Sequence, residues 1–147
     1  MLLELIATLC AGLFGGAAIY ITLVEHPARL ECGTALAISE FGPSYRRATV
    51  MQASLAALGL VASVGAWLEG RGLVVLIAGL MLGLVIPFTL IVILPTNKAL
   101  LDPGLDRGSA DAAALLARWG RLHAVRSILS AVAFGVLACH LAWPGRV

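Results

Sequence analysis

The stretch RWGRLHAVRS, residues 118–127, opens the last apolar run of the chain with charged and aromatic residues. The residues from Ser127 to Trp143 contain no Asp, Glu, Lys or Arg, and their number is close to the lower limit for a helix that crosses a membrane. We therefore expect the span to begin near His123, which places Arg126 roughly one to two turns below the membrane surface. An ionisable side chain at that depth is costly and usually faces a partner or a cavity.

The polar residues of this stretch share one face of the expected helix. Spacings of four, three and four residues align Trp119, His123, Arg126 and Ser130. Because lipid would meet these side chains on any outward face, we expect this face to point into a bundle.

The composition extends the membrane interpretation to the whole chain. It is 61% hydrophobic and 12% charged, with a mean hydropathy of +1.00, whereas soluble domains are close to one half apolar. Residues 5–24, 48–68 and 73–94 carry no charge, and each run is long enough to span a bilayer. We predict an all-α, integral membrane four-helix bundle, one transmembrane domain over residues 1–147, with spans at about 5–25, 46–68, 73–95 and 121–143.

The first span is not expected to be a cleaved signal, because it lacks a basic leader and is too long. The formal net charge of +2 gives no basis for a nucleic-acid partner. Positive charge is nevertheless asymmetric and predicts an inner-membrane protein with cytoplasmic polar loops and both termini outside. Arg71 and Arg146 belong to the poorer side, and the richer side holds Arg29, Arg46, Arg47, Lys98, Arg107, Arg118 and Arg121.

Small residues predict close helix packing. Gly12 and Gly16 lie four residues apart in the first span, as do Gly79 and Gly83 in the third. Such spacing lets helix backbones approach closely. We interpret it as packing within the bundle, and a homo-oligomer interface is the alternative.

Prolines and a serine suggest where the helices begin and bend. Pro27 is expected to kink or break the first helix at His26, and Pro87 to kink the third. Residues 28–42 suit a short interfacial helix or turn, after which Pro43 would start the second span. Ser109 is a predicted cap for an amphipathic helix that continues into the fourth span.

Ionisable and amide side chains gather at one end of the predicted bundle. They are Glu25, His26, Tyr45, Gln52, Asn97, Trp119, His123 and Arg126. Polar groups inside a membrane bundle commonly mark a site, so we interpret this end as functional, the alternative being a polar cap that joins the helices. At the other end, Glu4 is expected to be a solvated first-turn acid and His140 an interfacial residue.

Two kinds of chemistry fit the polar end. His26, His123 and Glu25 could ligate a metal ion as two histidines and one carboxylate, or the histidines could hold a haem. Alternatively no cofactor is needed. His123 or His26 would then be a general base, and Arg126 and Asn97 would stabilise an oxyanion.

Aromatic residues near these groups suggest the substrate. Trp119 and Tyr45 offer flat apolar walls for an aromatic molecule, and Gln52 and Tyr20 complete the expected substrate-binding set. The predicted partners are thus the lipid bilayer and a hydrophobic small molecule.

Four motifs resemble a known family. VEHPAR (24–29), PSYRRATVMQ (43–52), PTNK (95–98) and WGRLHAVRS (119–127) are similar, in the same order, to the bacterial branch of the DUF1772, or anthrone oxygenase-like, membrane family. The resemblance covers nearly the whole chain. It implies a membrane oxidoreductase, because relatives in polyketide pathways oxidise an anthrone to an anthraquinone with dioxygen. It assigns no catalytic residues. The alternatives are a metal- or haem-binding protein, a small-molecule binding or transport module without turnover, and a structural membrane subunit.

Overall fold

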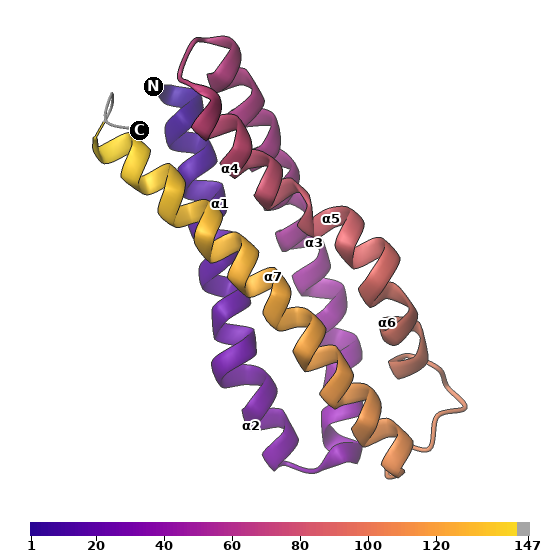
Figure 1. Ribbon diagram of the computed structural model, residues 1–147. Coiled ribbons are helices and arrows are strands. Elements are labelled where there is room, and N and C mark those ends of the chain that lie inside the picture. The colour runs from indigo at the N-terminus through magenta and orange to yellow at the C-terminus, as the bar shows by residue number, and fades with distance from the viewer. Residues whose placement is uncertain (144–147) are drawn as a thin grey trace.

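The computed structural model describes residues 1–143, which form four helical rods (Figure 1). The first rod joins α1 (Leu2–Tyr20), a π-helical turn η1 (Ile21–Glu25) and α2 (His26–Glu31), and the second is α3 (Thr34–Leu68). The third rod joins α4 (Leu73–Gly83), α5 (Val85–Phe88), a second π-helical turn η2 (Thr89–Ile93) and α6 (Leu94–Leu100). The fourth rod is α7 (Ala110–Ala142). All four rods are long and apolar enough to cross a membrane, which confirms the predicted all-α four-helix bundle.

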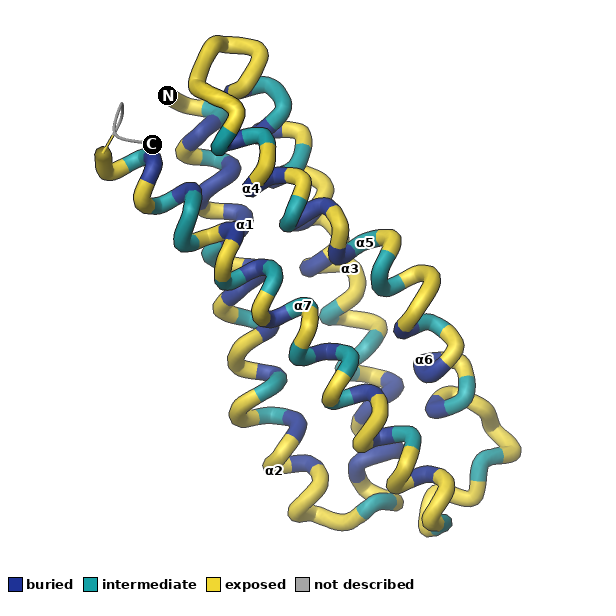
Figure 2. The backbone as a smooth tube through the Cα atoms, viewed as in Figure 1, coloured by how far each residue is buried: buried dark blue, intermediate teal, exposed yellow. Residues whose placement is uncertain are grey.

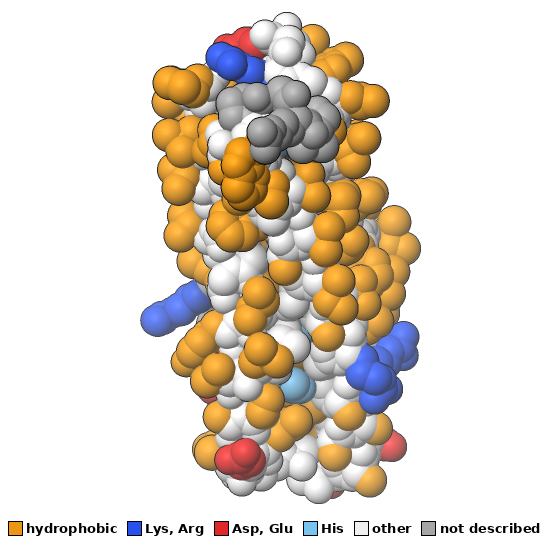
Figure 3. Space-filling model, turned by 60° about the vertical axis from the view of Figure 1, so that its left-hand side comes forward, with side chains coloured by type: hydrophobic (Ala, Val, Ile, Leu, Met, Phe, Trp, Pro, Cys, Tyr) orange, Lys and Arg blue, Asp and Glu red, His pale blue; other side chains and the backbone are white. Residues whose placement is uncertain are grey.

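The surface fits a bilayer environment. Burial follows the inner faces of the rods, while hydrophobic side chains cover the outside in the view of Figure 3 (Figure 2, Figure 3). Both described chain ends lie at one end of the bundle, opposite the α2–α3 turn and the α6–α7 connection (Figure 1). Arg146, counted above on the side poorer in charge, lies outside the described residues. We call the end with α2 and α6 the motif end.

One predicted boundary is wrong. Residues 34–42 are not a separate interfacial segment, because α3 runs unbroken from Thr34 through Pro43. An interior proline costs about 3 kcal/mol. This cost is offset because the same segment buries Ile38 and Phe41, and burying such a side chain away from water contributes about 1.5–3 kcal/mol.

Three other prolines, Pro27, Pro87 and Pro95, lie within rods at places where the helix widens or is interrupted. A π-helical turn precedes both Pro27 and Pro95, and in each case the proline occupies the second position of the helix that follows. Such turns add a residue to the helical repeat and are frequent at functional sites. They aim His26 and Asn97, both buried, toward the bundle interior. Upstream of Pro87, the helix is interrupted at Leu84, as predicted.

The cap of the fourth rod is confirmed. The side chain of Ser109 accepts a hydrogen bond from the backbone N–H of Ala112, at 3.1 Å. From there α7 continues without a break to Ala142, so the amphipathic segment and the fourth span are one helix.

The end with the chain termini differs from the prediction. Glu4 is not solvated, because it is 4% exposed, and His140 is 8% exposed. The Nε2–H of His140 donates to the carbonyl of Arg71 at 2.9 Å, and the same nitrogen lies 3.6 Å from Glu4 Oε1. These contacts join α1, α7 and the α3–α4 turn, which explains why the side chains of Glu4 and His140 are buried.

Gly12, Gly79 and Gly83 pack within the chain, as interpreted, whereas Gly16 is exposed and an added Cβ there would meet no other helix. A Cβ at Gly12 would meet the ring of Phe134, and one at Gly83 would meet Leu60. Helices α3 and α4 also approach closely at Gly79, where an added Cβ would overlap the side chain of Ser63.

We therefore expect Gly79→Ala to destabilise the bundle by at least about 1–3 kcal/mol, because α3 and α4 must move apart. Thermal unfolding in detergent micelles measures this effect. The matched control is Gly16→Ala, where an added Cβ meets nothing within 4 Å. Equal melting temperatures for the two variants would contradict the close contact.

Candidate functional site

Most of the residues proposed from the sequence line one cavity at the motif end. The cavity is small, about 20 Å³. Its predicted members are Tyr45, Gln52, Asn97, Trp119, His123 and Arg126, and its other lining residues are Ile21, Arg29, Phe41, Ser44, Ala48 and Thr49. We call this set the core site. It draws side chains from all four rods, so the bundle must be assembled before the site exists.

His123 is held by hydroxyl groups that the sequence did not single out. Its Nδ1 lies 3.0 Å from the hydroxyl of Thr22, which in turn lies 2.8 Å from the hydroxyl of Ser127. Ser127 donates to the carbonyl of Ala18 at 2.9 Å. The imidazole is 2% exposed, and within residues 1–143 its Nε2 makes no hydrogen bond. The one sequence signal for Ser127 is its spacing of four residues from His123.

Trp119 packs against both imidazoles. Its ring lies 4.7 Å from that of His123, nearly parallel, and 5.1 Å from that of His26. Phe41 meets the same indole edge-on at 5.3 Å. Trp119 is therefore covered largely by protein, and it fixes the two histidine rings relative to each other.

Arg126 is a cation without a carboxylate partner. Its Nη2 donates to Gln52 Oε1 at 2.6 Å, and its guanidinium lies over the ring of Phe14 at 5.4 Å. No Asp or Glu of the described chain lies within ion-pair distance of it. A cation inside a membrane span is costly unless something compensates it. Here the compensation is one amide oxygen and one aromatic ring.

Several buried polar atoms of this end have no hydrogen-bond partner among the described residues. They are His26 Nδ1, Gln52 Nε2, Thr96 Oγ1, Asn97 Oδ1 and Arg126 Nε. Buried polar groups are normally hydrogen-bonded, and each exception needs an explanation. Gln52, Asn97 and Arg126 line the core site, so a polar ligand or water there would supply partners for their unpaired atoms.

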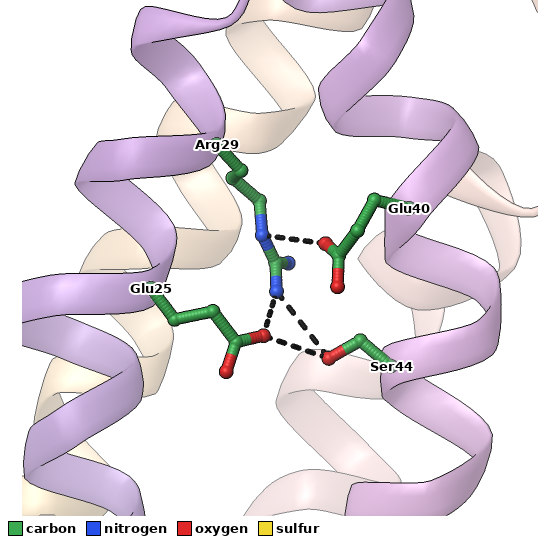
Figure 4. Close-up of polar contacts among 4 residues, drawn as sticks. All are labelled: Glu25, Arg29, Glu40 and Ser44. Carbon is green, nitrogen blue, oxygen red and sulfur yellow. Dashed lines mark hydrogen bonds and ion pairs between the residues drawn. The ribbon is translucent and has the colours of Figure 1, made fainter.

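A second polar cluster lies beside the core site (Figure 4). Arg29, whose side chain is 5% exposed, pairs with Glu25 in the same rod and with Glu40 Oε2 at 2.8 Å across on α3. Ser44 donates to Glu25 Oε1 at 2.8 Å. Sequence reasoning missed Arg29, Glu40 and Ser44 as a group, because Glu40 fell in the segment read as interfacial. We call these four residues the Arg29 cluster.

The predicted metal ligands do not converge. Glu25 and His26 are neighbours on one helical rod, and the carboxylate is taken by Arg29 and Ser44. Between Met1 and Trp143, no three His, Cys, Asp or Glu side chains are placed to hold a metal ion. A haem between His26 and His123 does not fit either, because Trp119 packs on both rings and the cavity is far smaller than a porphyrin.

Tyr20 stands apart from the other predicted residues. It is 56% exposed and lines a larger groove, about 530 Å³, between the first rod and α3. Three residues, Ile21, Ser44 and Ala48, line both this groove and the core site.

The imidazole of His26 packs against Gly120, in space that a larger side chain would occupy. An added Cβ there would lie 2.6 Å from His26 Nε2. We expect Gly120→Ala to displace the imidazole and alter the environment of Trp119. Fluorescence emission measures this change in the background W67F/W143F, which lacks the other two tryptophans. Gly135→Ala, where an added Cβ meets nothing within 4 Å, is the control and should leave the emission unchanged.

Comparison with known proteins gives one family. A family model described as anthrone oxygenase matches residues 41–136. The matched region holds Tyr45, Gln52, Asn97, His123 and Arg126, whereas Glu25 and His26 precede it. Neither a search of curated proteins nor a search of solved structures finds a match.

Proposed function

This chain belongs to the anthrone oxygenase family, and from that membership we propose that it is a membrane-embedded oxygenase acting on a hydrophobic, anthrone-like aromatic molecule at the motif end. In this reaction a ring CH₂ and dioxygen give a ring carbonyl and water. Both CH₂ hydrogens leave with one oxygen atom, and the carbon keeps the other.

The observation that carries the proposal is that Arg126 is a buried cation without a carboxylate partner among the described residues. The hard step is removal of a proton from the CH₂ carbon, which leaves an electron-rich anion with its charge on the carbonyl oxygen of the anthrone. Arg126 is held by Gln52 but has no carboxylate partner among residues 1–143. A preorganised donor in a poorly hydrated site stabilises such an anion far more than water does. Asn97, with its buried amide, is the second donor of the core site.

His123 is the base that the geometry favours. Thr22 holds Nδ1, which leaves Nε2 for the substrate, and the residue lines the core site. A positioned base typically contributes about 10²–10⁴-fold to the rate of such a step. His26 is the alternative, because its Nδ1 has no partner in the described chain, but it is not among the lining residues.

A second cavity would supply dioxygen. It measures about 100 Å³, lies between α3 and the α5–η2 segment, and shares Gln52 and Arg126 with the core site. Its other walls include Phe14, Ala56 and Val85. Apolar cavities take up small apolar molecules readily, and dioxygen is one.

A binding or transport module without turnover is the second candidate, and the size of the core site favours it. A cavity of about 20 Å³ holds one water molecule and no three-ring aromatic unless it opens. Oxygen uptake separates the two functions. Dithranol, a hydroxylated anthrone, added to the full chain in nanodiscs should consume oxygen faster than its spontaneous oxidation in empty nanodiscs. Binding without faster uptake would favour the module.

Orientation is a separate proposal. We propose that the motif end faces the cytoplasm and that the protein lies in the inner membrane, a proposal supported by the excess of Lys and Arg at this end. A cysteine at Ser109, introduced into the cysteine-free background C10A/C32S/C139S, should react with a membrane-impermeant maleimide only after the cells are opened. Labelling of Ser109→Cys from the periplasm of intact cells would reverse this orientation.

A further inference from the structure

We propose that the groove between the first rod and α3 is where the aromatic substrate binds, with Glu25 accepting a hydrogen bond from a substrate hydroxyl and Arg47 facing a ring oxygen. This inference rests on the proposed function and adds to it a place, an acceptor and a specificity for hydroxylated rings.

Size separates the groove from the core site. At about 530 Å³ it falls within the roughly 300–1,000 Å³ typical of small-molecule pockets, whereas the core site measures about 20 Å³. Among the cavities of the described chain that touch the core site, the one beside α5 measures about 100 Å³. A three-ring molecule therefore fits the groove and neither of the others.

The groove is amphipathic along its length. Ala17, Tyr20 and Met51 form part of its apolar half, and the first two lie in the charge-free part of the first span. Tyr20 and Met51 are 56% and 48% exposed on the outside of the bundle, where lipid would meet them. An apolar molecule dissolved in the bilayer can reach this half without crossing water.

The polar half offers two carboxylates, Glu25 and Glu40, and one cation, Arg47. Glu40 Oε2 is paired with Arg29. Glu25 Oε1 is engaged by Arg29 and Ser44, but its Oε2 makes no hydrogen bond within residues 1–143, and the side chain is 28% exposed (Figure 4). Arg47, also a lining residue, has no hydrogen bond or ion pair to any described residue. A carboxylate oxygen and a guanidinium that line the same groove match a ring that carries a hydroxyl group and a carbonyl or phenolate oxygen.

The wall between the groove and the core site is thin. Ile21, Ser44 and Ala48 line both spaces. A ring bound in the groove thus lies one layer of side chains from His123 and Arg126. Movement of these three side chains would bring the reacting carbon to the base, which reconciles a large ligand with a closed core site.

The test uses the full chain in phosphatidylcholine nanodiscs and danthron, an oxygen-stable dihydroxyanthraquinone, as the probe. Ala48→Trp places an indole in the groove and should weaken danthron binding by about tenfold or more. The reason is that the ring loses its contacts with the groove wall, and a tenfold change in Kd corresponds to a small part of the binding free energy of such a ligand. Ala57→Trp is the matched control, because Ala57 is exposed on α3 outside the groove. It should bind danthron within about twofold of the unmodified chain.

A second measurement does not depend on a bulky side chain. Met51→Cys, placed in the background C10A/C32S/C139S, should react with N-ethylmaleimide, and danthron should slow this reaction in proportion to its occupancy. Anthraquinone without hydroxyl groups should protect less well. Glu25→Gln should reduce this preference for the hydroxylated ring, because an amide oxygen is a weaker acceptor than a carboxylate.

The outcomes separate the groove from the proposed function. If Ala48→Trp changes neither danthron binding nor dithranol turnover, and danthron does not protect Met51→Cys, the groove is not the substrate-binding site. The oxygenase function would then stand. Danthron binding that Ala48→Trp weakens, without oxygen uptake from dithranol, would support the groove as the binding site and contradict the oxygenase function. A phospholipid retained through purification, lost in Ala48→Trp and not displaced by danthron, would assign the groove to lipid and overturn the inference.

Discussion

Replacing Arg126 with methionine is expected to lower dithranol turnover by about 10²-fold or more, the usual effect of removing one preorganised oxyanion donor. Methionine keeps an apolar stem of similar length and removes the charge. Steady-state oxygen uptake in nanodiscs measures the change. Arg118→Met, an exposed position on the same helix, is the control and should retain full activity.

Stability should change in the opposite sense from activity. Because Arg126 has no carboxylate partner among the described residues, its removal leaves no buried countercharge behind. The variant should therefore melt at or above the temperature of the unmodified chain. A folded and fully active Arg126→Met protein would remove this residue from the mechanism and favour the polar cap as the role of this end.

Replacing Arg29 with methionine is expected to destabilise the bundle, because the substitution removes both ion pairs of this side chain. Arg29 is nearly buried and pairs with Glu25 and Glu40. Removing one partner of a fully buried ion pair costs roughly 3–5 kcal/mol. Glu40 is 45% exposed and can regain water, so we expect a smaller loss, about 2 kcal/mol, by thermal unfolding in micelles.

The double variant Arg29→Met/Glu25→Gln provides the control. It removes the Glu25 carboxylate that Arg29→Met leaves without its cation and should recover much of the lost stability. No recovery would mean that Arg29 stabilises the bundle through packing on Trp119, from which its guanidinium lies 5.9 Å, and not through charge.

The global fold was accessible from the sequence because bilayer physics leaves few choices. Charge-free runs of sufficient length must be helices, since no other single segment satisfies its backbone in lipid. The same argument placed Trp119, His123 and Arg126 on an inward face, and all three line the core site. Family membership is likewise confirmed.

The sequence failed where distant contacts outweigh local preference. Pro43 looked like a helix start, but burial of Phe41 keeps the helix continuous. Glu4 looked solvated because its partner His140 lies at the far end of the chain. The π-helical turns before Pro27 and Pro95 could not be foreseen, because local periodicity does not encode a single added residue.

The two halves of the chain meet at the core site. The first and third rods each carry a π-helical turn two residues before a proline. Helices α3 and α7 each carry an aromatic residue seven positions before a polar one, Tyr45 before Gln52 and Trp119 before Arg126. Gln52 and Arg126 then bond to each other at 2.6 Å across the bundle. Residues at such a junction respond to movement of either half, which suits a site that must open to admit a ring.

We propose that the motif end of this bundle oxidises the CH₂ group of a bound anthrone to a carbonyl. The most direct test is the conversion of dithranol under isotopically heavy dioxygen, with mass spectrometry of the product and the full chain in nanodiscs. We expect protein-dependent formation of danthron with one heavy oxygen atom in the new carbonyl and the other in water, and loss of this product in Arg126→Met. Product formed no faster than in empty nanodiscs would contradict it.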